Sequence, residues 1–366
     1  MPRVIYSLMF GLNDYVGHIY QYHSSISKIC KINSWEHIGL VPKDCKIDIP
    51  KSWKNVLAKG GWENKSLKQN LVSSWKNFLF LKKFLRDRKS NDVLFLEHFS
   101  VFNIFSLVLS LLFTRPNCQF WVLHRFVFPK YGIKTVLYKV FHWLVKKKVG
   151  REHLVLLTDS DLLAKEQLIL FKNAVRVVPI PHTNISDSNP ENKYLEGISM
   201  WWPGGSTRWD KGLDYINALS KQLLSKKEVK LIVAESAKGK IVDSENIVYL
   251  PTSLSSDKYY KLMKSVSLIL VPYIPSEYKL RTSGIFVEAI AAGATVVTFK
   301  NTWMAYELGK YGLEDYLAIN PEEFSLDRVM QIIDFNLDDK IKSMKNEYIV
   351  FHSENNYANV IKNLSS

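Results

Sequence analysis

The chain has 366 residues, too many for one core of ordinary size and enough for two Rossmann-sized domains. Apolar residues make up 47% and aromatic residues 13% of the chain, without repeats or biased tracts, which excludes a disordered protein. The net charge of +14 belongs to the first half, because residues 1–183 hold 28 Lys and Arg against 12 Asp and Glu. This asymmetry predicts that the first domain meets an anionic partner, either phospholipid headgroups, a phosphorylated acceptor or nucleic acid.

Cysteine usage and the apolar segments indicate a cytoplasmic protein. Cys30, Cys45 and Cys118 are scattered without metal-ligand spacing, which is typical of a reducing compartment. The start of the chain has no long apolar stretch of the kind that a signal peptide requires. The most apolar segment, 101–113, is shorter than the about 20 residues that span a bilayer, so we expect a buried helix there.

In the first half, apolar strand-like runs alternate with helical patterns. The predicted strands cover 4–10, 92–98, 119–124, 153–158 and 175–180, and the predicted helices begin near Gly17 and cover 66–89, 101–113, 133–148 and 160–171. Such alternation is typical of a parallel sheet with helices on both faces. A polar, turn-rich stretch follows, so we expect a basic domain over 1–183 and a linker over 184–197.

The second half repeats the alternation. The predicted strands lie in 197–202, 230–236, 246–251, 267–273 and 294–299, and the predicted helices begin at Leu213, Ser256, Ser283 and Met304. We expect a second domain over 198–338 and a helical segment over 339–366 that crosses back to the first domain. The predicted fold class is therefore α/β, with two doubly wound Rossmann-like domains facing a cleft, where ligands bind beyond the carboxyl ends of strands.

The segment VPYIPSEYKLRTSGIFVEAIAAG, residues 271–293, could bind an anion. Ser283 and Gly284 open a helix whose first amides have no partner inside the helix, and Arg281 precedes it. Glu288, one turn further along, could reach a sugar hydroxyl. The alternative interpretation is that Ser283 and Gly284 only cap the helix and that Glu288 is a solvated helix residue. The spacing of these residues alone does not decide between this interpretation and an anion site.

The segment WWPGGSTRWDKGLDYINAL, residues 201–219, places two cations after a strand. Its glycines allow the backbone to approach a ligand closely, and Arg208 and Lys211 could balance a diphosphate. The alternative is a strand-to-helix loop with surface cations. Neither a GxGxxG nor a GxxxxGK[ST] motif occurs in the chain.

Together, GGSTRWDKGLDYINAL and SGIFVEAIAAGATVV resemble the donor-binding domain of GT-B glycosyltransferases, most of all the retaining enzymes of family 4. The resemblance covers about residues 200–310. It implies that Lys211 and Arg208 contact the donor diphosphate, that the Ser283 and Gly284 amides bind its phosphates, and that Glu288 binds the ribose.

One position departs from the family pattern. Eight residues before the ribose glutamate the family has an acid that contacts the donor sugar, whereas this chain has Leu280. Glu277 is the nearest acid and is a candidate for the sugar contact. The departure leaves the sugar, and the choice between retention and inversion, unassigned.

The first domain offers His124, His18 and Glu97 as catalytic candidates. His124 and Glu97 lie at the ends of predicted strands, and His18 follows the first strand. An inverting enzyme would need one such group as general base. In a retaining enzyme the leaving diphosphate could help to deprotonate the acceptor, while the cations stabilise its charge. For each histidine, the alternative is a core or surface group with its hydrogen bonds satisfied and no catalytic role.

No HExxH or paired-Cys motif occurs, and we expect neither a metal site nor a cofactor, so that the nucleotide sugar is a substrate. The segments 66–89 and 139–151 interleave lysines with aromatic residues, a pattern found on anionic membrane faces and also in core-packed helices. We expect a nucleotide-sugar donor, a lipid-linked or oligosaccharide acceptor, and a peripheral position on the inner face of the membrane.

Two other functions would use parts of the same sequence. A sugar-nucleotide epimerase can be built on the same fold but needs no basic domain. A nucleic-acid-binding protein would use the basic half, but the positive charge is diffuse and no nucleic-acid motif occurs, so we expect no nucleic-acid partner. We therefore expect a GT-B glycosyltransferase of surface polysaccharide biosynthesis.

Overall fold

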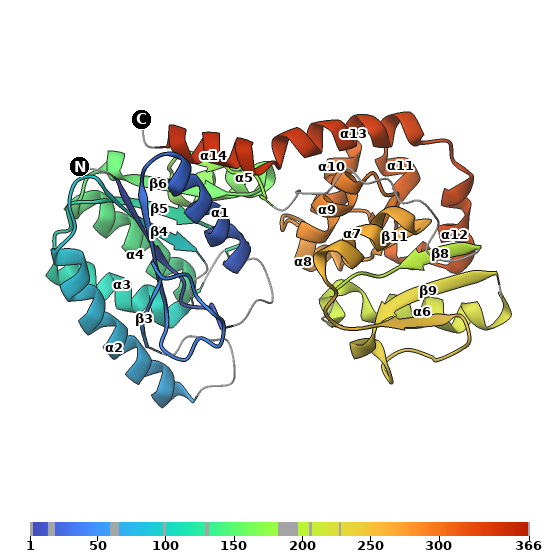
Figure 1. Ribbon diagram of the computed structural model, residues 1–366, viewed down its shortest axis with the longest axis horizontal. Coiled ribbons are helices and arrows are strands. Elements are labelled where there is room, and N and C mark those ends of the chain that lie inside the picture. The colour runs from blue at the N-terminus through green and yellow to red at the C-terminus, as the bar shows by residue number, and fades with distance from the viewer. Residues whose placement is uncertain are drawn as a thin grey trace. The chain divides into compact units, whose positions relative to one another are not determined.

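The computed structural model describes residues 3–13, 19–58, 66–97, 100–128, 132–181, 197–204, 207–226 and 228–364. The chain divides into two compact units, Met1–Pro181 with Tyr357–Ser366, and His182–Asn356. Each unit is built on one parallel sheet, of seven strands in the first and six in the second (Figure 1). The predicted α/β class with two Rossmann-like domains is confirmed.

The first unit has the strand order β3-β2-β1-β4-β5-β6-β7. Its strands are β1 (Val4–Leu8), β2 (Glu36–Pro42), β3 (Lys54–Leu57), β4 (Asp92–Glu97), β5 (Gln119–Leu123), β6 (Leu154–Thr158) and β7 (Val175–Val177). Its helices include α1 (Ile19–Ile32), α2 (Leu67–Arg86), α3 (Val101–Phe113), α4 (Ile133–Lys148) and α5 (Asp161–Phe171). The sequence analysis did not predict β2 and β3, which form one edge of this sheet.

The two faces of this sheet carry different helices. Along β4, Phe95 contacts His23 of α1, with ring centroids 5.5 Å apart. Its neighbours Leu94 and Leu96 point the other way and share a core with α2, α3 and α4. Alternation along the strands therefore places α1 on one face and α2, α3 and α4 on the other.

The apolar segment 101–113 forms a sheet-covering helix, α3. The hydroxyl of Ser100 caps the helix by accepting from the amide of Asn103 at 3.2 Å. Ser106 and Ser110 donate to carbonyl oxygens of α2 at 3.0 and 3.3 Å, which ties the two helices together. Within the described ranges, no helix is both long and apolar enough to cross a membrane.

The second unit has the strand order β10-β9-β8-β11-β12-β13. Its strands are β8 (Ile198–Trp201), β9 (Val229–Ala234), β10 (Ile247–Leu250), β11 (Leu268–Val271), β12 (Val296–Phe299) and β13 (Ala318–Ile319). Its helices include α6 (Leu213–Gln222), α7 (Ser256–Ser265), α8 (Pro275–Tyr278), α9 (Gly284–Ala292), α10 (Trp303–Gly309), α11 (Glu314–Leu317), α12 (Leu326–Met330) and α13 (Asp338–Phe351). Strands β8 and β11 are adjacent, so the loops that follow them meet at one edge of the sheet.

The chain ends in a separate helix, α14 (Glu354–Asn363), which follows α13 after a break at His352 and Ser353. From Tyr357 onward this helix belongs to the first unit. The Tyr357 side chain is fully buried, and its ring lies edge-on to Tyr22 of α1 with centroids 6.0 Å apart. At the other end of α14, Arg176 donates to the carbonyl oxygen of Asn363 at 3.4 Å.

Candidate functional site

Two glycines shape the loop between β8 and α6. Gly212 has a φ of +86°, and a Cβ there would lie 2.2 Å from the carbonyl oxygen of Pro272, so only glycine fits. Gly204 has a φ of +121°, and a Cβ there would meet Ile285 of α9 and the Lys211 ammonium, each at 3.5 Å. The loop, the lysine and the start of α9 therefore converge on Gly204. Gly205 and Ser206 lie outside the described residues.

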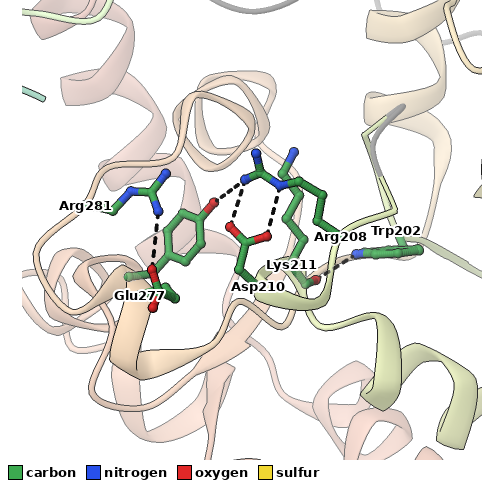
Figure 2. Close-up of polar contacts among 7 residues, drawn as sticks. Trp202, Arg208, Asp210, Lys211, Glu277 and Arg281 are labelled. Atoms are coloured by element: carbon green, nitrogen blue, oxygen red, sulfur yellow. Dashed lines mark hydrogen bonds and ion pairs between the residues drawn. The ribbon is translucent and has the colours of Figure 1, made fainter. Parts of the chain in front are cut away.

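Arg208 is held by an acid that the sequence analysis did not select. Its guanidinium donates to both carboxylate oxygens of Asp210, at 2.9 and 2.8 Å, and to the hydroxyl of Tyr278 at 3.5 Å (Figure 2). Burial opposes the charge, but Asp210 and Tyr278 outweigh burial and raise the pKa of Arg208. Arg208 therefore remains a cation, with much of its hydrogen-bonding capacity already used by Asp210.

Lys211 lies beside the Arg208 guanidinium (Figure 2). Its backbone carbonyl accepts from the indole of Trp202 at 3.2 Å, which fixes the residue at the end of its 3₁₀ turn. Burial lowers the pKa of Lys211 to about 8, and the neighbouring Arg208 and Arg281 act in the same direction. Among the described residues, no side chain or carbonyl pairs with this ammonium, although the ring of Tyr273 lies 5.8 Å away. A half-buried ammonium in this state could pair with an anion.

The start of α9 supplies unpaired amides next to this lysine. The hydroxyl of Ser283 caps the helix by accepting from the amide of Phe286 at 3.2 Å, and the amide of Val287 bonds to the Ser283 carbonyl at 3.1 Å. Within the described part of the chain, the amides of Gly284 and Ile285 donate to no acceptor. They can bind an anion that lies between the helix start and Lys211.

Arg281 and Glu277 face each other just before α9. The guanidinium and the carboxylate are 3.8 Å apart, one turn from each other, and both side chains are partly exposed (Figure 2). The guanidinium also lies over the ring of Tyr278 at 4.7 Å. Arg281 is close enough to Lys211 to lower the pKa of that lysine, so the two belong to one cationic site.

Glu288 has a partner that the sequence analysis did not predict. The hydroxyl of Tyr259, in α7, donates to its carboxylate at 2.8 Å. Burial raises the pKa of Glu288 to about 7, and the hydrogen bond from Tyr259 opposes that shift. Tyr259 therefore orients the carboxylate and favours its charged form.

His124 lies in the core of the first unit. Its side chain has no exposed surface and is surrounded by the rings of Phe126, Phe128, Tyr138 and Phe171. Its Nε2 lies 3.3 Å from Nε2 of His142, and burial lowers the pKa of His124 well below its ordinary value. In this arrangement His124 is a buried group that packs among aromatic rings and whose neutral form is favoured.

Glu97 is also buried, within a charged network beyond the ends of β4, β5 and β6. Its carboxylate lies 3.2 Å from Nε2 of His23 and 3.5 Å from Arg125, which in turn contacts Asp159 at 2.7 Å. The ring of Tyr22 lies 4.7 Å from the Arg125 guanidinium. Burial opposes the arginine charge, but Tyr22 and the two carboxylates raise its pKa above the usual value. Arg125 therefore balances part of the negative charge of Glu97 and Asp159, and the sequence analysis selected only Glu97 from this network.

The remaining candidate, His18, lies outside the described residues. In the part of the chain that the structure describes, no three His, Cys, Asp or Glu side chains lie close enough together to hold a metal ion.

No protein-family model matches the chain, and no curated protein sequence matches it. Solved structures do match over the whole chain. The N-terminal domain of a Candida albicans trehalose-6-phosphate phosphatase has a TM-score of 0.64 at 12% identity, covering 100% of this chain and 97% of that chain. A Rickettsia africae glycosyltransferase has 0.65 at 14%, covering 100% and 98%, respectively. The Escherichia coli trehalose-6-phosphate protein bound with UDP-2-fluoro glucose has 0.66 at 11%, covering 99% of each. The fold of this chain is therefore GT-B.

Proposed function

We propose that this protein is a glycosyltransferase that transfers a sugar from a nucleotide diphosphate to an acceptor. The observation that carries the proposal is the Lys211 ammonium, which has no partner among the described residues and lies 3.5 Å from the Cβ position of Gly204, as does the Ile285 side chain in the first turn of α9. A diphosphate would fill this space and meet both the ammonium and the helix amides. The resemblance to family 4 makes the same assignment and supports a retaining enzyme.

In the proposed reaction the protein stabilises the diphosphate as it leaves the sugar. Lys211, Arg281 and the amides of Gly284 and Ile285 would balance the charge that grows on the phosphate oxygens when the glycosidic bond breaks. Glu288, oriented by Tyr259, would accept hydrogen bonds from the ribose hydroxyls. Arg208 would stabilise the diphosphate through its positive charge at a distance more than through direct hydrogen bonds, since Asp210 already uses much of the hydrogen-bonding capacity of its guanidinium. The proposed site uses these groups in place of a metal.

We propose a UDP- or GDP-sugar as the donor, and a similar structure that carries a UDP-sugar analogue supports the first of these. For the acceptor, the basic first half of the chain favours a lipid-linked or oligosaccharide substrate with negative charge. Such an acceptor would place the protein on the inner face of the membrane, in the assembly of surface polysaccharides. Glu277 is the proposed sugar contact, since Leu280 takes the place of the family's acid.

Thermal unfolding with added nucleotides tests the donor site. We expect UDP or GDP at 100 times its dissociation constant to stabilise the protein by about 2.7 kcal/mol, which raises the melting temperature by several degrees. UMP, which lacks the second phosphate, should have a smaller effect. If no nucleoside diphosphate changes the melting temperature, the proposed function is wrong. Turnover of a donor without any acceptor would instead indicate an epimerase.

The affinity for UDP should be highest between about pH 7 and pH 8. Glu288 accepts ribose hydroxyls only when it is deprotonated, so affinity rises as pH increases through its pKa of about 7. Lys211 binds phosphate only when it is protonated, so affinity falls as pH increases through its pKa of about 8. Calorimetric titration across this range measures both limbs of the profile.

Single substitutions separate the two limbs. Glu288→Gln should remove the rise near pH 7 and leave the fall, which belongs to Lys211. Tyr259→Phe should shift the rise to higher pH, because Tyr259 lowers the pKa of Glu288. An unchanged profile in Glu288→Gln would exclude this carboxylate from the nucleotide site.

A further inference from the structure

The helices α2, α3 and α4 form a surface of a single charge sign. Five Lys or Arg lie in α2 and five in α4, and none of the three helices contains an acidic residue. Between Glu97 and Glu152 the sequence has no Asp or Glu at all. All three helices pack on the same face of the sheet (Figure 1), so the cations of α2 and α4 lie on one side of the first unit.

Large apolar side chains lie exposed between these cations. Leu67, Leu71, Trp75 and Leu79 follow one another at every fourth residue of α2, so they form a stripe along one side of the helix. All four side chains are exposed, and Trp75 remains 57% accessible. The opposite side of α2 packs in the core through Leu81 and Leu85. The stripe therefore belongs to a second, outward apolar side that no described residue of the first unit covers.

The apolar surface continues from α2 onto α3. Trp75 packs on Phe78 with ring centroids 5.0 Å apart, and Phe78 packs on Phe113 at 5.9 Å. Phe113 is 62% exposed and has the Lys82 ammonium 5.2 Å from its ring. The aromatic side chains of the two helices thus form one continuous patch with a cation at its edge.

The end of α4 extends this patch. Lys148 donates to the carbonyl oxygen of Leu112 in α3 at 3.2 Å, which joins the two helix ends. Trp143 is 55% exposed, with the Lys147 ammonium 4.9 Å from its ring. A tryptophan with a lysine beside it is suited to the boundary between lipid headgroups and acyl chains.

We infer that this α2–α4 face binds an anionic lipid bilayer. The face consists of the exposed apolar residues Leu67, Leu71, Trp75, Leu79, Leu112, Phe113 and Trp143 together with Lys68, Lys76, Lys82, Lys83, Arg86, Lys139, Lys147 and Lys148. The apolar side chains would enter the interface while the cations meet lipid phosphates. The inference rests on the membrane contact of the proposed function and assigns that contact to a surface. Charge complementarity favours lipid, and the leucine stripe has no role in a nucleic-acid contact.

Co-sedimentation of the whole protein with vesicles tests this inference. We expect binding to phosphatidylcholine vesicles that contain phosphatidylglycerol, and little binding to phosphatidylcholine alone. Replacing Lys68, Lys76 and Lys83 by Gln should weaken binding on the order of 100-fold, since each lysine near the surface contributes about fivefold. Trp75→Ser combined with Phe113→Ser should weaken binding at least about tenfold.

The matched control removes one exposed cation and one exposed apolar side chain from the opposite face of the same sheet. Lys31→Gln combined with Ile32→Ser fits this purpose, because both lie at the end of α1 and Ile32 is 74% exposed. This variant should bind vesicles like the original protein. Equal loss in the control, or vesicle binding that ignores phosphatidylglycerol, would overturn the inference.

Two further outcomes would also overturn it. Steeply salt-dependent binding to random RNA that is lost in the triple Gln variant, without vesicle binding, would assign the face to nucleic acid. A dimer in sedimentation velocity that dissociates with Trp75→Ser would assign it to a second copy of the chain. Vesicle binding needs neither donor nor acceptor, and the nucleotide-induced thermal shift needs no lipid, so each proposal can fail without the other.

Discussion

Lys211→Ala should abolish the thermal stabilisation by UDP and lower kcat/KM roughly 10²–10³-fold, the usual loss when one group that stabilises growing oxygen charge is removed. The reason is geometric, because this ammonium has no partner in the described structure and lies 3.5 Å from the position of a Gly204 Cβ. The tip of the Ile285 side chain, in the first turn of α9, also lies 3.5 Å from that position. The measurements are steady-state transfer with a saturating acceptor and melting with and without nucleotide.

The controls for Lys211 exclude a folding defect. Without ligand, Lys211→Met should melt at or above the temperature of the original protein, because it removes a half-buried charge without breaking an ion pair. Lys221→Ala, which removes an exposed cation of the neighbouring α6, should keep both the UDP effect and the activity. If Lys211→Ala retains full nucleotide stabilisation, the diphosphate lies elsewhere.

Gly212→Ala should have the largest effect on stability, about 3 kcal/mol. The methyl group would lie 2.2 Å from the carbonyl oxygen of Pro272 and 2.8 Å from its ring, in a left-handed conformation that alanine disfavours. Both the loop after β8 and the segment after β11 would have to move apart. The expected result is a lower urea midpoint together with weaker UDP binding, since Lys211 precedes this glycine.

Gly239→Ala is the matched control for this substitution. Gly239 also has a left-handed φ, of +75°, but a Cβ there would meet nothing within 4 Å. It should therefore cost only the conformational term, about 1 kcal/mol, and leave UDP binding unchanged. Equal losses at the two positions would show that the close approach to Pro272 is not what requires Gly212.

The parts of the fold that the sequence predicted are those whose signal is local. Strands β4, β5 and β6 are buried on both faces, so each reads as a continuous apolar run. Strand β2 begins with Glu36 and His37 and includes a glycine and a proline, so its sequence lacks the continuous apolar run by which a buried strand is predicted. His37 is nevertheless buried, because Ser7 and Ser27 bond to its ring at 2.9 and 2.6 Å. Nothing in the local sequence indicates those partners.

The candidate site divides in the same way. Lys211 and Ser283 belong to short motifs, so the sequence directly around them was enough to select them as candidate site residues. The partners that tune the site come from far along the chain: Tyr259 lies 29 residues from Glu288, and Tyr278 lies 70 residues from Arg208. Only the packing of α7 and α8 beside the motifs brings these side chains together.

His124 illustrates a different gap in the sequence reasoning. The sequence analysis selected His124 because it lies at the end of β5. Its role also depends on the face of the sheet on which its side chain lies. Val122 belongs to the core beneath α2, α3 and α4, and alternation places His124 on that same side, under Phe128 and His142. Arg125, one residue later, turns to the opposite side and joins Glu97 and Asp159.

The return of α14 to the first unit affects the order in which the protein can fold during synthesis. The second unit is one continuous segment, His182–Asn356, and every residue of it leaves the ribosome before Tyr357 does. The first unit starts earlier but lacks Tyr357, which packs on Tyr22, until the whole second unit has been synthesised. Of the two units, the one that the ribosome begins earlier is therefore the one that it completes later.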